Sequence, residues 1–230
     1  MKKVVVLTGE GISAESGIKT FRDADGLWKG HDVMEVATPE GFERNPELVL
    51  EFYNQRRRQL LEVEPNKAHL NLVKLEESHH VEIITQNVDD LHERAGSKNV
   101  LHLHGELLKV RSTINENEVL DWRKDLKLGH LDKNGHQLRP HIVWFGEMVP
   151  MLDKAVEIVR TADVLVIIGT SMQVYPAASL IDYAKEETPI YFIDPRPSIS
   201  ENSLNKLTII DKIASEGTEL LIHMINKEIN

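Results

Sequence analysis

Short apolar runs alternate with helix-like segments along most of this 230-residue chain. Most of the runs are continuously apolar, as expected for parallel strands that are buried on both faces of a sheet. The strand-like runs lie at 3–8, 81–86, 100–104, 141–145, 164–169, 190–194 and 207–210. Helical patterns lie between them at 46–62, 68–77, 151–162, 177–186 and 216–230. This order predicts an α/β fold with a doubly wound parallel sheet.

Two segments interrupt the alternation. The first, 32–64, is largely helical, and the second, 107–140, is polar and has no clear periodicity. We expect both to leave the sheet and to form together a small second lobe built from two insertions. The remaining stretches, 1–31, 65–106 and 141–230, would then form the large domain that holds the sheet.

The loop after the first strand adds a further constraint. The run 4–7 leads into Gly9-x-Gly11-x-x-Ala14, which fits the pattern of a dinucleotide-binding turn. Glycines in such a turn let the backbone approach a pyrophosphate at the N-terminus of the next helix. The pattern alone is a weak signal, but the loop continues with polar and bulky residues that a structural turn does not need. These are Ser13, Glu15, Ser16, Phe21 and Arg22.

The position of the next strand argues against a dehydrogenase. In that class an acidic residue that binds the adenosine ribose ends the second strand, about 20 residues after the glycines. Here the next strand-like run comes only at 81–86, and the chain continues as Asn87-Val88-Asp89. The spacing therefore weakens a hydride-transfer interpretation.

Polar residues follow four of the predicted strands. They are Gln86, Asn87 and Asp89, then His102 and His104, then Gly169, Thr170 and Ser171, and finally Asp194. Each group alone is typical of an ordinary turn at the end of a strand. The carboxyl ends of parallel strands meet at one edge of the sheet, where such folds bind ligands. Four loops of this kind predict one binding cleft, in which a histidine can act as a base near neutral pH.

These motifs together resemble those of the sirtuins, the NAD-dependent protein-lysine deacylases. The resemblance rests on 8–22, Gln86-Asn87-x-Asp89, His104-Gly105, the Val-Trp-Phe-Gly-Glu run at 143–147, and Gly169-Thr170-Ser171. Their order and spacing match from about residue 3 to residue 226. The resemblance implies that the large domain is Rossmann-like and binds NAD as the cofactor.

The resemblance also implies roles for individual residues. Those implied to bind NAD are Gly9, Glu10, Gly11, Ile12, Ser13, Ala14, Ile18, Thr20, Phe21, Arg22, Trp28, Gln86, Asn87, Val88, Asp89, Gly169, Thr170, Ser171, Asp194 and Ala214. Within this set, the nicotinamide pocket would consist of Ala14, Ile18, Phe21, Asn87 and Asp89. The adenosine half would lie along Gly169, Ser171, Asp194 and Ala214.

The implied catalytic residues are His104 and Asn87, with His104 as the general base. In the implied reaction the acyl-lysine carbonyl oxygen attacks the ribose C1′ atom as nicotinamide leaves. His104 then takes a proton from the ribose hydroxyls, and the products are nicotinamide, O-acyl-ADP-ribose and free lysine. This role needs a neutral imidazole, which an ordinary histidine pKa permits.

Two further segments bear on the substrate, an acylated-lysine protein or peptide. The resemblance implies that Val143, Phe145, Gly146 and Glu147 bind the peptide as an added strand. The pair Tyr53-x-x-Arg56 is similar to the acyl pocket of the desuccinylase and demalonylase branch of sirtuins. Residues at i and i+3 share a helix face, and a guanidinium suits bidentate carboxylate binding. A solvated basic face at 56–58 with Tyr53 packed below it is the alternative.

The chain departs from the sirtuin pattern by having no cysteine, which excludes the usual structural zinc site of two Cys-x-x-Cys pairs. The histidines at 102, 104, 130, 136 and 141 lack paired ligand spacing, so we expect no metal. We expect 107–140 to be held by its own packing. The residues expected to do so are Leu120, Trp122, Leu126 and Leu131.

Glu10 is a second departure, because the family has a small residue between the two glycines. A carboxylate there would repel a diphosphate if it faced the ligand, unless it turns outward. Asp194 stands where many relatives have Asn, and an Asp can still accept hydrogen bonds from ribose hydroxyls.

The composition of the chain limits the kinds of partner that it can bind and the cellular compartment that we expect for it. The net charge of -10 argues against direct nucleic-acid binding. No apolar run is long enough to span a bilayer, and Met1 leads into a strand without a signal-peptide layout. We therefore expect a cytoplasmic monomer that does not bind membranes.

Two other functions stay open. A catalytically weak NAD or ADP-ribose sensor would explain Glu10, although binding alone does not need Asn87, Asp89 and His104 together. An ADP-ribosyltransferase or NAD glycohydrolase would share the pocket but would not need the acyl-lysine features at Tyr53 and Arg56.

Overall fold

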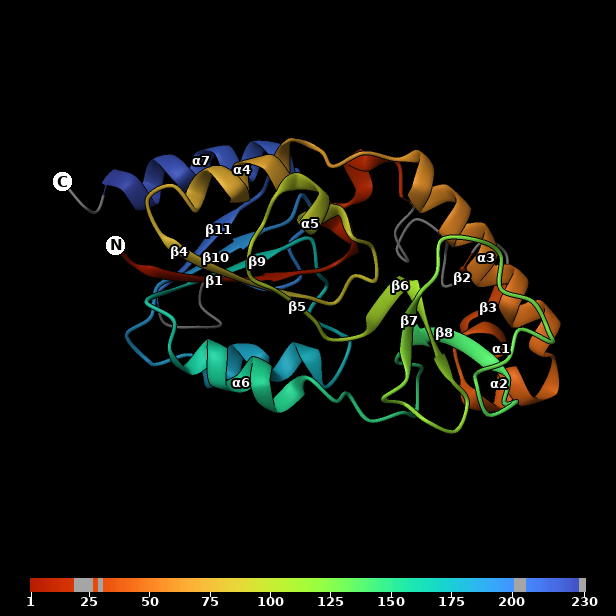
Figure 1. Ribbon diagram of the computed structural model, residues 1–230. Helices are drawn as coiled ribbons and strands as arrows, with labels where there is room; N and C mark the ends of the chain where they lie inside the picture. The colour runs from red at the N-terminus through yellow and green to blue at the C-terminus, as the bar shows by residue number, and fades with distance from the viewer. Residues whose placement is uncertain (19–26, 29–30, 201–205, 228–230) are drawn as a thin grey trace.

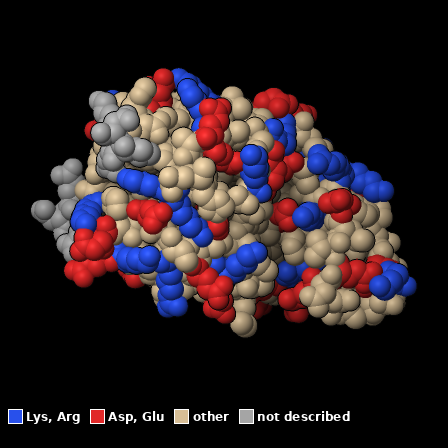
Figure 2. Space-filling model, turned by 60° about the vertical axis from the view of Figure 1, so that its left-hand side comes forward, with Lys and Arg blue, Asp and Glu red and all other residues tan. Residues whose placement is uncertain are grey.

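The computed structural model describes residues 1–18, 27–28, 31–200 and 206–227, which form a large and a small lobe (Figure 1). The large lobe contains a six-stranded sheet, and the small lobe contains helices beside a three-stranded sheet. Among the described helices, none is long and apolar enough to cross a membrane. On the face shown in Figure 2, acidic and basic side chains are interspersed.

The large sheet is parallel throughout, with the strand order β11-β10-β9-β1-β4-β5. Its strands are β1 (Lys3–Thr8), β4 (His80–Thr85), β5 (Val100–His102), β9 (Val164–Ile168), β10 (Ile190–Ile193) and β11 (Leu207–Ile210). From the central β1 the chain adds β4 and β5 on one side and later β9, β10 and β11 on the other. The predicted doubly wound, Rossmann-like sheet is confirmed, and its order reverses between β1 and β9, where such folds bind ligands.

Helices bury both faces of this sheet. The first face packs against α4 (Lys67–Leu75) and α7 (Ala214–Lys227), and the second against α6 (Leu152–Arg160) and the 3-10 helix η4 (Ala177–Tyr183). Within β1, Val4 and Val6 belong to the first core cluster, while Val5 and Leu7 belong to the second. Burial on both faces explains why these strands are continuously apolar in sequence.

The small lobe combines the two insertions. The chain before β4 supplies β2 (Leu27–Trp28), β3 (His31–Asp32), α1 (Val33–Val36), α2 (Pro39–Arg44) and α3 (Pro46–Glu62). The later insertion supplies an antiparallel sheet of β6 (Gly105–Ser112), β7 (Val119–Asp121) and β8 (Leu138–Ile142). Phe52, Leu107 and Ile142 come from α3, β6 and β8 and share one buried cluster. This confirms a second lobe built from two insertions.

The helix α3 begins where local chemistry predicts. The Asn45 side chain accepts a hydrogen bond from the backbone N–H of Leu48 at 3.1 Å, and Pro46 occupies the first helical position. An Asn cap satisfies a backbone donor that has no partner within the helix, and proline there loses no helical hydrogen bond. The start of α3 therefore follows from an Asn-Pro pair that can be read in the sequence.

Polar side chains of α3 anchor the later insertion. The buried Arg57 donates through Nε to the carbonyl of Leu107 at 3.1 Å and through Nη1 to Oδ1 of Asn54 at 2.8 Å. Asn54 exchanges two hydrogen bonds with the backbone of Leu126, at 2.9 and 2.8 Å. Burial lowers the pKa of Arg57 to about 10, so its guanidinium stays charged at neutral pH. These bonds join α3 to the cysteine-free segment 107–140.

The predicted packing of that segment is half right. Leu126 is fully buried, and Trp122 packs against the same cluster. Leu120 and Leu131 are 42% and 51% exposed, so their predicted roles in the core are wrong. An apolar residue at the margin of a small sheet is not covered by a helix or a second sheet. The sequence does not show which residues lie in that position.

The strand predicted at 141–145 is also displaced. The observed strand β8 ends at Ile142 and pairs with β6 in the small sheet, and it is not part of the large one. After it the chain turns, with Gly146 at a φ of +89°. The run is only partly buried, because Ile142 and Trp144 lie in the small-lobe core while Phe145 is 47% exposed. Burial alone did not tell which sheet the run joins.

Candidate functional site

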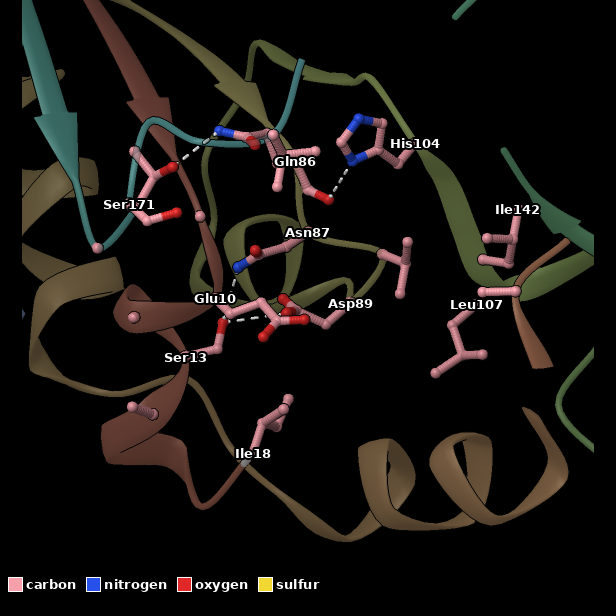
Figure 3. Close-up of a pocket in the computed structure, with 18 of the residues that line it drawn as sticks. Glu10, Ser13, Ile18, Gln86, Asn87, Asp89, His104, Leu107, Ile142 and Ser171 are labelled. Atoms are coloured by element: carbon pink, nitrogen blue, oxygen red, sulfur yellow. Dashed lines mark hydrogen bonds between the residues drawn. The ribbon is translucent and has the colours of Figure 1, made fainter. Parts of the chain in front are cut away.

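A cavity of about 440 Å³ lies between the two lobes, at the carboxyl ends of β1, β4, β9 and β10. The sequence-predicted residues that line it are Gly9, Glu10, Gly11, Ser13, Ala14, Ile18, Tyr53, Arg56, Gln86, Asn87, Val88, Asp89, His104, Val143, Phe145, Gly146, Glu147, Gly169, Thr170, Ser171, Asp194 and Ala214. Figure 3 shows the large-lobe residues on one side of it and Leu107 and Ile142 of the small lobe on the other.

A few of the predicted site residues are not placed at this cavity. Ile12 lies beneath the first loop, fully buried in the core of the large lobe. Thr20, Phe21 and Arg22 lie outside the described residues, and so does the side chain of Trp28.

The glycines of the first loop make room for the loop after β9. The N–H of Gly11 donates to the carbonyl of Gly169 at 2.8 Å. A Cβ on Gly11 would lie 2.6 Å from the Cα of Gly169, and a Cβ on Gly9 would lie 2.8 Å from the same carbonyl oxygen. Gly169 has a φ of +61°, which favours glycine. The sequence explained these glycines by the approach of the backbone to a pyrophosphate. The structure adds a second reason, which is the close packing of two backbone loops.

Three side chains from two loops form a hydrogen-bonded chain at the cavity wall. The Nδ2 of Asn87 donates to Ser13 Oγ at 3.1 Å, and this hydroxyl donates to Asp89 Oδ2 at 3.0 Å. The other oxygen of Asp89 accepts from the N–H of Leu91 at 3.2 Å, at the start of α5 (Leu91–Ala95). Burial raises the pKa of Asp89, against the opposing effect of these bonds. Figure 3 shows this chain below the cavity.

The geometry of His104 gives it one basic nitrogen. Its Nδ1 lies 3.1 Å from the carbonyl oxygen of Gln86 (Figure 3). A carbonyl only accepts, so Nδ1 carries the proton and Nε2 holds a lone pair. Burial lowers the pKa of His104, which keeps the ring neutral at pH 7. A neutral imidazole at the cavity wall can act as a general base.

His102 has a different environment, although it is only two residues away. The strand β5 ends at His102, so the predicted strand 100–104 is shorter than expected. Its Nε2 lies 2.8 Å from Glu93 and its Nδ1 lies 3.1 Å from the carbonyl of Asn87. Burial opposes its charge, but the bond to Glu93, the charges of Glu93 and Glu106 and the Asn87 carbonyl together raise the pKa of His102. His102 thus supports the Asn87 loop from outside the cavity.

Two predicted residues of the first and fourth loops bear directly on a bound dinucleotide. Glu10 is among the residues that line the cavity. The buried Asp194, after β10, accepts from the N–H of Arg196 at 2.8 Å and lines the same cavity. Glu10 and Asp194 therefore both contribute a carboxylate to the residues around this cavity.

The pair on α3 reaches the cavity from the small lobe. Tyr53 and Arg56 both line it, and the guanidinium carbon of Arg56 lies 5.8 Å from the ring centre of Phe52. Tyr53 is only 1% exposed, and burial raises its pKa to about 12. Its hydroxyl oxygen accepts from Nε1 of Trp144 at 3.0 Å. The basic residue that is exposed on this helix is Arg58, which pairs with Glu51.

The segment 143–147 lines the cavity but is not a free strand. The N–H of Val143 donates to the carbonyl of His104, and that of Phe145 donates to the carbonyl of Ala37, both at 2.9 Å. The carboxylate of Glu147 accepts from Arg139 at 2.6 Å and from the N–H of Trp144 at 2.8 Å. The charge of Glu147 is thus neutralised within the protein, and it shapes the turn.

Several lining residues were not singled out from the sequence. They are Val33, Ala37, Gln59, Leu60, Leu107, Ile142, Val149, Val174, Tyr175, Pro176, Ile193, Pro195, Arg196 and Ile213. Helical spacing from Tyr53 could have found Leu60, which lies seven residues further along the same face. Most of the others are apolar, and nothing in sequence distinguishes an apolar wall from a core.

Known proteins show the same combination of fold and motifs. The chain matches the model of the Sir2 family over residues 9–176. It is 65% identical over 196 residues to an NAD-dependent protein deacylase of Helicobacter pylori, covering 85% of this chain and 86% of the relative. It is 51% identical over 231 residues to an NAD-dependent protein deacylase of Bacteroides thetaiotaomicron, covering 98% of each. A solved complex of a Sir2 homologue with NAD has a TM-score of 0.88 and 41% identity, covering 100% of this chain and 91% of that one.

Proposed function

The chain belongs to the Sir2 family and is an NAD-dependent protein deacylase, and from this premise we propose that it removes succinyl and malonyl groups from lysine as well as acetyl groups. The observation that carries the proposal is that Tyr53 and Arg56 line the same cavity as His104. The products would be free lysine, nicotinamide and O-acyl-ADP-ribose.

The chain's own residues fit NAD. Gly9, Gly11 and Gly169 line the cavity where their two loops pack closely together, so they present backbone and no side chain to a diphosphate. Within the described part of the chain, the buried Oδ1 of Asn87 has no hydrogen-bond partner, and such an atom is costly unless a ligand satisfies it. A carboxamide N–H, which nicotinamide carries, is a suitable donor. Bound NAD would supply the ribose, whose C1′ carbon loses nicotinamide and whose hydroxyl oxygen takes up the acyl group.

The residues around this carbon can bind and orient the reacting groups, and one of them can accept a proton. Ser13 fixes the side chains of Asn87 and Asp89 through its two hydrogen bonds. His104 presents the lone pair of Nε2, because its Nδ1 proton is held by Gln86. We assign His104 as the general base that accepts a hydroxyl proton.

The acyl pocket combines a charge with a neutral donor. Arg56 can bind a terminal carboxylate through two N–H groups. Tyr53 stays protonated at neutral pH, since burial raises its pKa to about 12, so its hydroxyl can donate. Leu107 and Ile142 provide an apolar wall on the small-lobe side of the same cavity. An acetyl group carries nothing for Arg56 to bind.

Replacing Arg56 by methionine tests the proposal. Hydrogen bonds to charged groups contribute about 1.5–3 kcal/mol, so kcat/KM for a succinyl-lysine peptide should fall by about 10- to 100-fold. The kcat/KM for the same peptide carrying acetyl-lysine should change by less than about 3-fold. Both values are measured from peptide mass over time at saturating NAD.

Arg58→Met is the matched control, because Arg58 lies on the same helix but pairs with Glu51 and Asp125 at the surface. It should leave both rates close to those of the unmodified protein. Equal losses on the succinyl and acetyl peptides in Arg56→Met would contradict the acidic-acyl proposal and leave deacylation itself untouched.

A further inference from the structure

Trp144 contacts the predicted acyl pocket through a single directed hydrogen bond. Its Nε1–H donates to the hydroxyl oxygen of Tyr53 at 3.0 Å, and the two rings lie 6.4 Å apart at 32°. Both side chains are buried, with 2% and 1% exposed, so bulk water does not compete for the bond. An indole nitrogen donates only, and the phenol oxygen must therefore be the acceptor here.

This bond limits where the phenol proton of Tyr53 can point. A phenol hydrogen lies near the ring plane and has two favoured directions, one on each side of the oxygen. The indole hydrogen of Trp144 already occupies one of these two directions, so the phenol proton of Tyr53 points in the other one. Tyr53 lines the cavity, and among the described residues no hydrogen-bond acceptor is found for this proton. It is a buried donor that a ligand can satisfy.

The indole ring of Trp144 is held in place by charged residues of the small lobe. The guanidinium carbon of Arg139 lies 3.4 Å from the ring centre of Trp144, and Glu147 accepts from the backbone N–H of Trp144 at 2.8 Å. Glu147 is bound in turn by Arg139 and, at 3.3 Å, by Arg111. The donor is therefore held by a charged cluster on β6 and β8, while the phenol that it orients comes from α3.

We propose that Trp144 is a positioning residue for acyl specificity, which orients the Tyr53 hydroxyl so that its proton is presented to an acceptor at the far end of the acyl chain. This rests on the proposed function, in which that acceptor is a carboxylate. Acetyl-lysine has no distal acceptor, so the contribution is confined to longer acyl groups. Trp144 acts through Tyr53 and does not touch the reacting atoms.

A double-mutant cycle on succinyl- and acetyl-lysine versions of one peptide tests the inference. Tyr53→Phe removes the donor, and because the acceptor is a charged carboxylate, kcat/KM for the succinyl peptide should fall by about 10- to 100-fold. Trp144→Phe frees the hydroxyl to rotate and should cause a smaller loss, mainly through KM. The double variant should match Tyr53→Phe, because the indole has no effect once the hydroxyl is absent. In each variant kcat/KM for the acetyl peptide should fall by less than kcat/KM for the succinyl peptide.

Two results would overturn the inference. One is additivity of the two losses, which would mean that Trp144 acts independently of the Tyr53 hydroxyl. The other is an equal loss of deacetylation in Trp144→Phe, which is the outcome of a general structural role or of poor folding. Failure of the proposed function is distinguishable, because Arg56→Met would then leave the ratio of the succinyl and acetyl rates unchanged.

Discussion

Replacing His104 by alanine is expected to lower kcat for deacylation by about 10²- to 10⁴-fold, the usual contribution of a positioned general base. The reason is the lone pair on Nε2, which exists because Nδ1 donates to the carbonyl of Gln86. Deacylation is followed by peptide mass and by nicotinamide release at saturating NAD. His80→Ala is the matched control, since His80 begins β4 at the end of the sheet away from the cavity. It should keep full activity.

The pH dependence of the unmodified protein provides a second check on His104. Burial lowers the pKa of this histidine from its ordinary value of 6.5, so the ring is neutral through the neutral pH range. Activity should therefore be constant near pH 7 and fall only when the pH drops below 6.5 and the ring becomes protonated. This acid limb should be absent from the residual activity of His104→Ala. A variant that retains more than about a tenth of the activity would contradict the assignment.

Gly11→Ala is expected to disrupt the junction between the first loop and the loop after β9. The new Cβ would lie 2.6 Å from the Cα of Gly169 and 2.8 Å from its carbonyl oxygen, both backbone atoms that cannot rotate away. Overpacking of this kind costs about 1–3 kcal/mol, so the free energy of unfolding should fall by that amount. The two loops must also separate, and affinity for NAD should fall by more than about 10-fold, which is more than 1.4 kcal/mol.

Gly17→Ala is the matched control for this glycine. It lies in the same loop, and the nearest atom to its Cβ is 3.9 Å away, but its φ is +94°. The substitution should cost only the backbone strain of about 1–2 kcal/mol and leave NAD affinity close to normal. Urea unfolding and titration with NAD measure the two quantities. If Gly11→Ala binds NAD as well as Gly17→Ala does, the close packing of the two loops is not what shapes the site.

The large lobe was predicted well from sequence because strands that are buried on both faces are continuously apolar in the sequence. The observed β1 and β11 have the predicted bounds, and so does α3, which is the one long helix of the small lobe. In each case the signal is local, since a continuous apolar run or an Asn-Pro cap needs no knowledge of neighbours. The doubly wound pattern also predicted that the loops converge on one edge of the sheet, whereas the order of its strands was not predicted.

The small lobe was predicted less well because its stability depends on contacts distant in sequence. Arg57 is 1% exposed, yet a charged residue on a helix reads as a surface residue. Its partner Leu107 is 50 residues away, and only the fold brings the two together. The exposed Leu131 is the reverse case, an apolar residue without a layer to cover it.

At the site, the sequence identified polar residues better than it identified what orients them. His104 was singled out together with His102, and both lie near the same strand end. Burial lowers the pKa of His104, whereas Glu93 helps to raise that of His102 against burial, and neither the burial nor the contact with Glu93 could be read from spacing. Trp144 was quoted within a motif, but its bond to Tyr53 joins residues 91 positions apart.

The most direct test of this account is the acyl preference of the unmodified protein. One lysine peptide is prepared in succinyl, malonyl and acetyl forms, and kcat/KM is measured for each with NAD, following peptide mass and nicotinamide release together. With Tyr53 and Arg56 in the acyl pocket, the succinyl and malonyl forms should exceed the acetyl form by about 10-fold or more, with one nicotinamide released per lysine freed. A higher kcat/KM for the acetyl form than for either acidic form would contradict the account.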